Sequence, residues 1–541
     1  MRLRLGSLAL LFILITSCQS GEIGKDKTVF AYNEINGLTS LDPAAASNFE
    51  NIWPINQLFN GLMQTNDSLK VVPCIARSYT LSPDGKTYTF SLRTDVYFHD
   101  NACFLDGKGR KVVARDFLFS FNRLYDGSVS SALGVMGNIN RSVGEGGFEA
   151  LNDSIFVIHL SQPFQPFISI LTMKFFSVIP HEAIALYGAD FRRNPVGTGP
   201  FVFRLWEEGN TLVLLKNDRY FERDATGNTL PYLDAVKVSF IKDKETAFME
   251  LLNGKFDMVS GADAFNANEV LDRQGELRLA YRTKFYLQKT TFLKTDYIGL
   301  LVDDKIAPSP LKNRFFREAL NYAIDRVQLI RYLRNNIGVP AIAGFIPAGL
   351  GAYDTSKVKG YSYDPDKARK LMALAGYKDG AGLPEMVIHT TENYREQMEF
   401  IQSQLARCNI NIQVSVEKPS VLRQSVNNSE YAFFRKSWFS DYADEENFMS
   451  LFYSKNFAPQ GVNFFHFSDS IFDSLYDAAQ QEPDLLKRRI LYQRMDQIIL
   501  EQAPIIPLYY DQSVRLVSHK IEGLATNGMN LLNLKTVRKK D

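Results

Sequence analysis

Hydrophobic residues change their spacing along this chain, and that change limits the folds it can adopt. In the earlier part they alternate with polar residues, as in KTYTFSLR, where Tyr88, Phe90 and Leu92 follow the turn sequence SPDG at 82–85. SIFVIHL (154–160) and AVKVSFI (235–241) predict two more strands. The later part follows helical spacing instead. The pattern therefore predicts a mixed α and β fold with most of its helices late in the chain.

Helical spacing is clearest in three later segments. In SPLKNRFFREALNYAIDRVQLIRYL (309–333) the periodic apolar positions, which predict one helix ended by NNIG, are Phe316, Leu320, Ala323, Val327 and Ile330. In DPDKARKLMALAGY, Asp364 is the predicted N-cap, Pro365 the first helical residue, and Gly376 lies beyond the end. A third apolar face comprises Leu491, Met495, Ile498 and Ile499. We interpret all three stripes as core packing that builds the scaffold.

A glycine pair stands between two predicted strands. In NPVGTGPFVF, Gly197 and Gly199 flank Thr198 and precede Pro200. Glycine permits left-handed backbone angles, so the motif predicts a sharp turn of that kind before a strand restarts at Phe201.

The N-terminus has the pattern of an export signal. Arg2 and Arg4 precede an apolar run, and the segment ends in ITSC at Cys18. The run is too short to cross a bilayer as a mature helix. ITSC resembles a bacterial lipobox, which implies a signal peptide at 1–17 and a lipid on Cys18; the alternative is a free cysteine beside a plain cleavage site. Either reading predicts an extracytoplasmic protein, and the lipobox predicts membrane anchoring in the cell envelope, on its periplasmic face.

The composition indicates how many domains the chain can form and which classes of partner it is not expected to bind. The chain has 541 residues, 45% hydrophobic and 13% aromatic, enough for two or three domains with their own cores. Lys plus Arg is 61 and Asp plus Glu is 60, so no overall field indicates nucleic acid or an anionic membrane surface as the partner.

Motifs for catalysis or metal binding are absent from the sequence. Beyond Cys18, three cysteines remain without zinc spacing: Cys74, Cys103 and Cys408. A disulfide between Cys74 and Cys103 and a set of free thiols both remain open. His181-Glu182 begins a metalloprotease pattern that Ala185 breaks. No phosphate-binding loop or serine elbow occurs. We therefore predict no enzyme, no cofactor and no metal site.

A set of motifs in order resembles the extracellular solute-binding proteins of family 5, the receptors of ATP-driven importers for peptides and nickel. The motifs are SLDPA (40–44), NGLM (60–63), VVPCIARSYTLSPDGKTYTFSLR (71–93), VGTGPF (196–201), FREALNYAIDR (316–326), YDPDKARKLMALAGY (363–377), WFSDYAD (438–444) and APIIPLYY (503–510). The resemblance implies an α/β, two-lobed periplasmic-binding-protein fold (type II, cluster C) with an extra inserted subdomain. It also implies a monomer that delivers a peptide or other small solute to an ABC permease in the inner membrane.

The same resemblance implies the division of the chain. Lobe I would comprise residues 27–58, 186–287 and 510–541, the inserted subdomain 59–185, and lobe II 288–509.

The stretch KSWFSDYADEENF (436–448) would carry the binding site. By resemblance, Asp441 of the W-x-x-D motif pairs with the free α-amino group of a peptide, and Trp438 and Tyr442 supply apolar walls. Further candidates are Glu34, before LDP, and Tyr509 of PLYY. The following carboxylates, Asp444, Glu445 and Glu446, are predicted to lie in a solvated turn or in the first turn of a helix instead of contacting the ligand.

Other readings of the ligand remain. No motif assigns a residue to a peptide's carboxylate, although Arg423 and Arg435 are available. Family 5 relatives also take up metal chelates, haem, opines and oligosaccharides, so a non-peptide solute is the alternative. An exported hydrolase is a third reading; its nearest motif, SKVK (356–359), lacks companion motifs.

Overall fold

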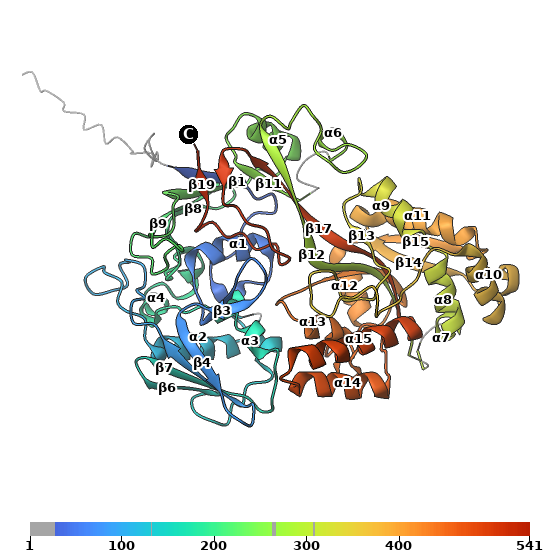
Figure 1. Ribbon diagram of the computed structural model, residues 1–541, viewed down its shortest axis with the longest axis horizontal. Coiled ribbons are helices and arrows are strands. Elements are labelled where there is room, and N and C mark those ends of the chain that lie inside the picture. The colour runs from blue at the N-terminus through green and yellow to red at the C-terminus, as the bar shows by residue number, and fades with distance from the viewer. Residues whose placement is uncertain (1–27, 131, 262–266, 304, 307–308, 541) are drawn as a thin grey trace, which may run out of the picture.

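Two long strands connect the two halves of the molecule. The structure is a computed structural model that describes residues 28–130, 132–261, 267–303, 305–306 and 309–540. In Figure 1 the strands β12 (Phe285–Leu300) and β17 (Ile505–Ser518) run side by side from one half into the other. The predicted signal peptide and Cys18 lie outside the described residues. No described helix is long and apolar enough to cross a membrane.

A single 11-stranded sheet passes through both halves in the order β15-β14-β16-β12-β17-β11-β1-β10-β9-β8, with β13 beside β17. Its other strands are β1 (Val29–Asn33), β8 (Phe201–Glu207), β9 (Thr211–Lys216), β10 (Ala235–Ser239), β11 (Met258–Ser260), β13 (Val339–Pro340), β14 (Met386–Thr391), β15 (Ile412–Glu417) and β16 (Phe433–Phe439). The antiparallel register of β12 with β17 shifts between Thr291 and Thr295. Such an irregularity bends a strand, and this one lies where the chain passes between the halves.

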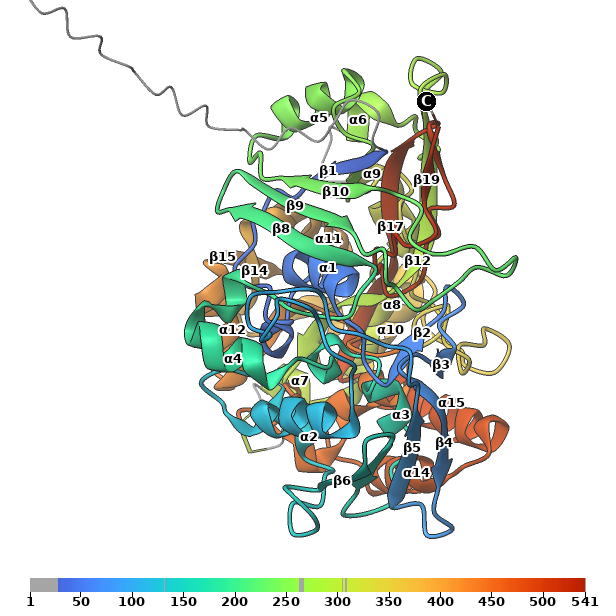
Figure 2. The same ribbon diagram turned by 90° about the vertical axis from the view of Figure 1, so that its left-hand side faces the viewer.

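The first half contains a second sheet of order β4-β5-β7-β6, which Figure 2 shows below the strands of the large sheet. The strands outside the large sheet are β2 (Met63–Thr65), β3 (Val71–Pro73), β4 (Ala76–Leu81), β5 (Thr87–Leu92), β6 (Phe148–Asn152), β7 (Ile155–His159), β18 (Ile521–Glu522) and β19 (Arg538–Lys539). The predicted alternation is confirmed in β5, where Tyr88 and Phe90 are buried. One core cluster runs from Phe30 through Phe90 to Leu534 and joins both sheets of this half.

Most helices belong to the second half (Figure 1). The first half has α1 (Phe49–Leu58), α2 (Ala114–Asn122), α3 (Phe167–Ile170), α4 (His181–Tyr187), α5 (Lys244–Leu252) and α6 (Ala267–Val270). The second has α7 (Ser309–Lys312), α8 (Arg314–Tyr322), α9 (Arg326–Leu333), α10 (Pro365–Leu374), α11 (Arg395–Ala406), α12 (Pro419–Asn427), α13 (Glu446–Met449), α14 (Ser470–Gln481) and α15 (Leu485–Gln502). The predicted start of α10 is confirmed, because the Asp364 side chain accepts from the Lys367 backbone N–H. The mixed α and β prediction is confirmed as well.

The prediction of one helix over 309–333 is wrong. The segment forms α7, α8 and α9, and the Asp325 side chain caps α9 by accepting from the Gln328 N–H. An N-cap residue has non-helical backbone angles, so it interrupts the helix there. Val327, counted as part of the apolar stripe, is 63% exposed.

The role predicted for the glycine pair is also wrong. Neither Gly197 nor Gly199 has a positive φ angle. Instead, a Cβ on Gly197 would lie 2.0 Å from the Leu58 carbonyl oxygen, and one on Gly199 would lie 2.4 Å from the Gln57 carbonyl oxygen. Glycine is required at both positions because the chain leading into β8 packs closely against the backbone at the C-terminal end of α1.

Candidate functional site

The loop after β16 reaches toward the first half of the molecule. β16 is antiparallel to β12, with Trp438 opposite Thr295. At its end, the ring of Phe439 lies 5.5 Å from that of Phe49 in α1, and Phe49 lies 5.9 Å from Phe292 in β12. Phe439 stays 37% exposed. These three rings, which we call the aromatic cluster, bring the two halves into contact at the connecting strands.

Asp441 lines a cavity of about 300 Å³ on one side of this cluster. The first half contributes Ala46, Ser47, Phe49, Ile52, Thr65, Ala132, Gly134, Val135, Thr172, Met173, Lys174, Phe175, Met529 and Leu531, and the second contributes Phe439, Ser440, Asp441 and Ala443. The Asp441 side chain is open to solvent. Protein atoms packed around its carboxyl group still desolvate it in part, and this raises the pKa of the carboxyl group against the effect of a hydrogen bond from Asn447. We call this space the Asp441 cavity.

Asn447 connects two of the predicted site residues. Its Oδ1 accepts from the Trp438 indole N–H at 2.9 Å and from the Asp441 backbone N–H at 3.4 Å. Asn447 is buried at the second position of α13. The sequence prediction missed this residue; the only signal was its place at the end of the acidic run, next to an apolar residue. Trp438 itself is half-buried and is not among the residues that line the cavity.

The prediction of a solvated turn is wrong for the three carboxylates, whereas the alternative of a first-turn helix charge is confirmed for Glu446, the first residue of α13. Asp444, Glu445 and Glu446 are 3%, 6% and 5% exposed. Asp444 pairs with Arg488 of α15 at 3.0 Å, and Glu445 accepts from the Ala352 backbone N–H at 2.8 Å. These partners replace water, which is why the three carboxylates tolerate burial.

Tyr442 belongs to the same buried network. Its hydroxyl group and that of Tyr476 both donate to the carboxylate of Glu446. Desolvation raises the pKa of Glu446, and the two hydroxyl donors oppose that rise. Tyr442 is buried and is not among the residues that line the Asp441 cavity, so its role as an apolar wall stays a prediction.

A second cavity, of about 440 Å³, is lined by residues of both halves and of the connecting strands. There Asp511 pairs with Lys294 at 2.8 Å and with Arg334 at 2.5 Å. Burial opposes ionisation of Asp511, but the two positive charges lower its pKa. Tyr509 is fully buried behind this wall; its hydroxyl donates to Gln397 at 3.2 Å and accepts from Arg334 at 3.0 Å.

Glu34 follows β1 in the first half. It is half-buried, and desolvation raises its pKa to about 7, while a hydrogen bond from the Asn36 backbone N–H opposes this shift. It lines neither of the two cavities between the halves. Its assignment as a ligand contact stays a prediction.

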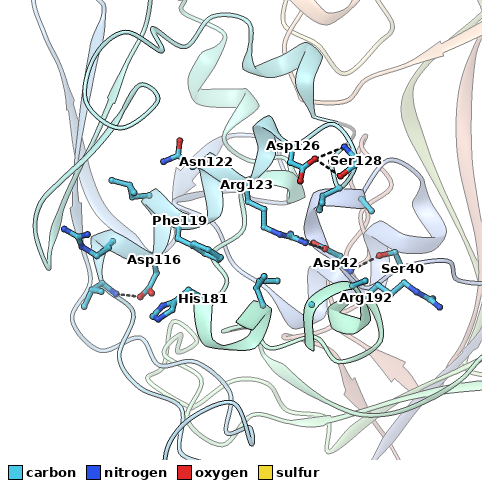
Figure 3. A pocket seen from close by; sticks show the side chains of 18 of the residues that line it. Ser40, Asp42, Asp116, Phe119, Asn122, Arg123, Asp126, Ser128, His181 and Arg192 are labelled. Atoms are coloured by element: carbon cyan, nitrogen blue, oxygen red, sulfur yellow. Dashed lines mark hydrogen bonds and ion pairs between the residues drawn. The ribbon is translucent and has the colours of Figure 1, made fainter. Parts of the chain in front are cut away.

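A larger cavity, of about 1450 Å³, lies within the first half and is shown in Figure 3. It shares no lining residue with the cavities between the halves. Its floor includes Phe119, and Arg123 pairs with Asp42 across it. Arg110 likewise pairs with Asp116 and Glu182. These ion pairs already neutralise several of the charged groups that line the cavity. Its volume alone therefore does not identify it as the ligand-binding site.

Comparison with known proteins gives a consistent result. The family model described as bacterial extracellular solute-binding proteins, family 5, matches residues 70–460. The chain is 28% identical over 499 residues to the glutathione-binding protein GsiB of Salmonella choleraesuis, covering 90% of each chain. The GsiB protein of Escherichia coli O1:K1 is equally similar, with 28% identity over 499 residues and 90% coverage of each chain.

Solved structures resemble the whole molecule. The periplasmic binding protein DppA of Helicobacter pylori, in complex with the peptide STSA, has a TM-score of 0.77 at 27% identity, covering 95% of this chain and 99% of that one. HbpA2 of Haemophilus parasuis has a TM-score of 0.80 at 23% identity, covering 95% and 100%. The second likeness concerns the fold alone. The two-lobed periplasmic-binding-protein fold predicted from sequence is confirmed by these structures.

Proposed function

This chain belongs to the bacterial extracellular solute-binding proteins of family 5, and from that membership we propose that it captures short peptides between its two halves. It is an extracytoplasmic receptor of an ABC importer. The observation that carries the peptide proposal is Asp441, a carboxylate lining a cavity to which both halves contribute. A peptide's α-ammonium group that leaves water there needs a fixed negative partner, and Asp441 supplies it.

The surrounding residues support this role. Asn447 holds the Asp441 backbone and the Trp438 ring in one arrangement, so the carboxylate is positioned before the ligand arrives. The aromatic cluster excludes water on one side of the cavity, which strengthens a charge-assisted bond. Trp438 and Tyr442 are proposed to act indirectly, through the loop that carries Asp441. Tyr509, beside the second cavity, and Glu34, in the first half, remain proposed ligand contacts.

We propose the predicted division of the chain, with lobe I at 27–58, 186–287 and 510–541, the subdomain at 59–185 and lobe II at 288–509. The core shared by both sheets of the first half supports treating lobe I and the subdomain as one moving body. Closure follows ligand binding to the extent that the ligand prefers the closed form. The permease then receives the closed form, and a lipid on Cys18 keeps the receptor at the membrane.

The test compares ligands that differ only in the α-amino group. Native mass spectrometry of the purified protein identifies the peptides that it retains, and calorimetry then measures each peptide with a free and with an acetylated N-terminus. Loss of a desolvated charge pair costs on the order of 2–5 kcal/mol, so acetylation weakens binding by about 30-fold or more.

Asp441→Asn is expected to remove this discrimination between the two forms. Asp218→Asn is the matched control, because Asp218 is exposed in the first half, away from both cavities. Equal affinity of the wild-type protein for free and acetylated peptides would show that Asp441 does not bind the amine.

A further inference from the structure

A lysine of the first half faces the space that Asp441 faces from the second. Lys174 begins the short 3₁₀ helix η4 (Lys174–Phe176) and lines the Asp441 cavity. It also lines a small polar cavity of about 40 Å³. The two cavities share Thr65, Lys174 and Leu531 as their common wall. Lys174 therefore stands at the boundary between a polar recess and the proposed ligand site.

The ammonium group of Lys174 has no negative partner among the described residues. No ion pair joins it to a described carboxylate, and no hydrogen bond from it to a described acceptor occurs. Desolvation, with a smaller contribution from the positive charge of Lys535, lowers its pKa to about 8, and Cys74 opposes this shift. A cation that is withdrawn from water without a counter-ion is costly to keep.

Several acceptors at the polar recess are already engaged. Gln64 accepts from Lys535 at 3.1 Å, and Glu222 pairs with the same lysine. The side-chain oxygen of Asn60 accepts from Thr198 at 3.1 Å. One more carboxylate, Asp67, lines the recess, but it is exposed to solvent and forms no ion pair with Lys174. No ion pair within the recess therefore neutralises Lys174, and the carboxylate of a bound ligand can do so.

We propose that Lys174 binds the carboxylate of the same ligand whose ammonium group meets Asp441, an inference that rests on the proposed peptide function. The ligand class follows from the geometry, because both charged ends enter one cavity of about 300 Å³. The receptor is thus built for small zwitterions, namely di- and tripeptides or a γ-linked peptide that carries both charges close together. A longer peptide, whose carboxylate falls outside the cavity, satisfies Asp441 alone.

This arrangement also links binding to closure. Lys174 belongs to the first half and Asp441 to the second, and each charge is opposite in sign to one end of a zwitterion. A ligand that contacts both is bound more tightly when the halves approach, which is the differential affinity that closure requires. A ligand that lacks either charge loses that advantage.

The experiment uses a mixture of dipeptides prepared with free C-termini and the same mixture prepared as C-terminal amides. Native mass spectrometry identifies the species that the full-length mature protein retains, and calorimetry measures the retained dipeptide against its amide. We expect the wild-type protein to prefer the free acid by about 30-fold or more, as for a truncated charge pair. Lys174→Met is expected to lose this preference, and Lys174→Arg to keep most of it.

Lys70→Met is the matched control, since Lys70 is an exposed lysine of the same half that lines neither cavity. Equal affinity of the wild-type protein for acid and amide overturns the role of Lys174, as does a Lys174→Met variant that still discriminates. If the Met variant does not fold, the acid-to-amide ratio of the wild-type protein decides alone. Preference for the free acid without preference for the free amine refutes the Asp441 assignment and leaves Lys174 in place; absence of any peptide binding refutes both.

Discussion

The rings of Phe49 and Phe439, which belong to opposite halves of the molecule, lie 5.5 Å apart between their centroids. Phe292, on a strand that connects the halves, completes the cluster at 5.9 Å from Phe49. The halves also meet at a second place, where the Gln165 backbone N–H donates to the Gln480 carbonyl oxygen at 2.8 Å. The two contacts lie on separate elements, so the approach of the halves depends on more than the hinge strands.

Phe439→Ala is expected to open the molecule. An aromatic pair contributes about 0.5–1.5 kcal/mol beyond its buried area, and this contact forms only when the halves approach. Small-angle scattering of the ligand-free variant should give a larger radius of gyration than the wild-type protein, with weaker peptide binding. Phe315→Ala serves as the control, because Phe315 is an exposed ring of the second half outside the cluster. An unchanged radius would show that this ring contact does not govern closure.

Binding of a free-amine peptide is expected to weaken in acid. Desolvation raises the pKa of Asp441 in the unliganded protein, whereas a bound ammonium group favours the ionised carboxylate. The bound state therefore holds fewer protons, so affinity is present above the raised pKa and is lost as the pH falls through it. Calorimetry across a pH series measures this slope. Asp441→Asn should flatten it and Asp218→Asn should preserve it; an identical slope in both variants would assign the titration to another group.

Asn447→Ala is expected to weaken peptide binding and to shift the fluorescence of Trp438, one of the 3 tryptophans in the chain. Its loss leaves the indole N–H and the Asp441 N–H without their common acceptor, and a buried donor left unsatisfied costs about 1–3 kcal/mol. The pH slope of the remaining binding should persist, because Asp441 still titrates. Asn428→Ala, at an exposed position of the same half, is the control. A variant with unchanged emission and affinity would refute the positioning role.

Stability is expected to fall as the pH rises toward 8. Burial raises the pKa of Asp496 to about 7, although its carboxylate accepts from the Phe345 N–H at 2.6 Å. The folded state thus binds a proton more readily than the unfolded chain. The free energy of unfolding contributed by this group is highest below the unfolded pKa and declines until the pH passes about 7.

Thermal unfolding at pH 5.5 to 8 measures this decline for the wild-type protein. Asp496→Asn should reduce the slope, whatever its effect on absolute stability, and Asp218→Asn should leave the slope unchanged. A slope that Asp496→Asn does not alter would assign the titration to other buried carboxyl groups, such as Asp444, whose pKa desolvation also raises.

Gly199→Ala is expected to destabilise the protein. The added Cβ would lie 2.4 Å from the Gln57 carbonyl oxygen, and backbone atoms there cannot move aside without disturbing α1. Overpacking of this kind typically costs about 1–3 kcal/mol. Denaturant unfolding measures the loss. Gly134→Ala is the control, because a Cβ there meets no atom within 4 Å; equal stability of the two variants would contradict the close-approach argument.

Local patterns in the sequence were enough to predict the elements that depend on neighbouring residues. The alternation that buries Tyr88 and Phe90 and the cap of α10 at Asp364 both appear as predicted. These features concern residues a few positions apart, where backbone geometry and side-chain spacing decide the outcome. The order of motifs also indicated the two-lobed family fold, whereas Asp441, taken from the W-x-x-D motif, stays a prediction as a ligand contact.

Features that depend on distant residues were decided only by the tertiary structure. The acidic run was predicted to be solvated, but its carboxylates are buried. Arg488 and the Ala352 N–H, both remote in sequence, pair with two of them and compensate for the loss of water. Gly199 is needed because of α1, far from it in the chain. Lys174 and Asp441 line one cavity although they lie far apart in the sequence. A charge pattern read along a chain records which groups are present; whether each meets water, a partner or a ligand is set by which distant segments the fold packs around it.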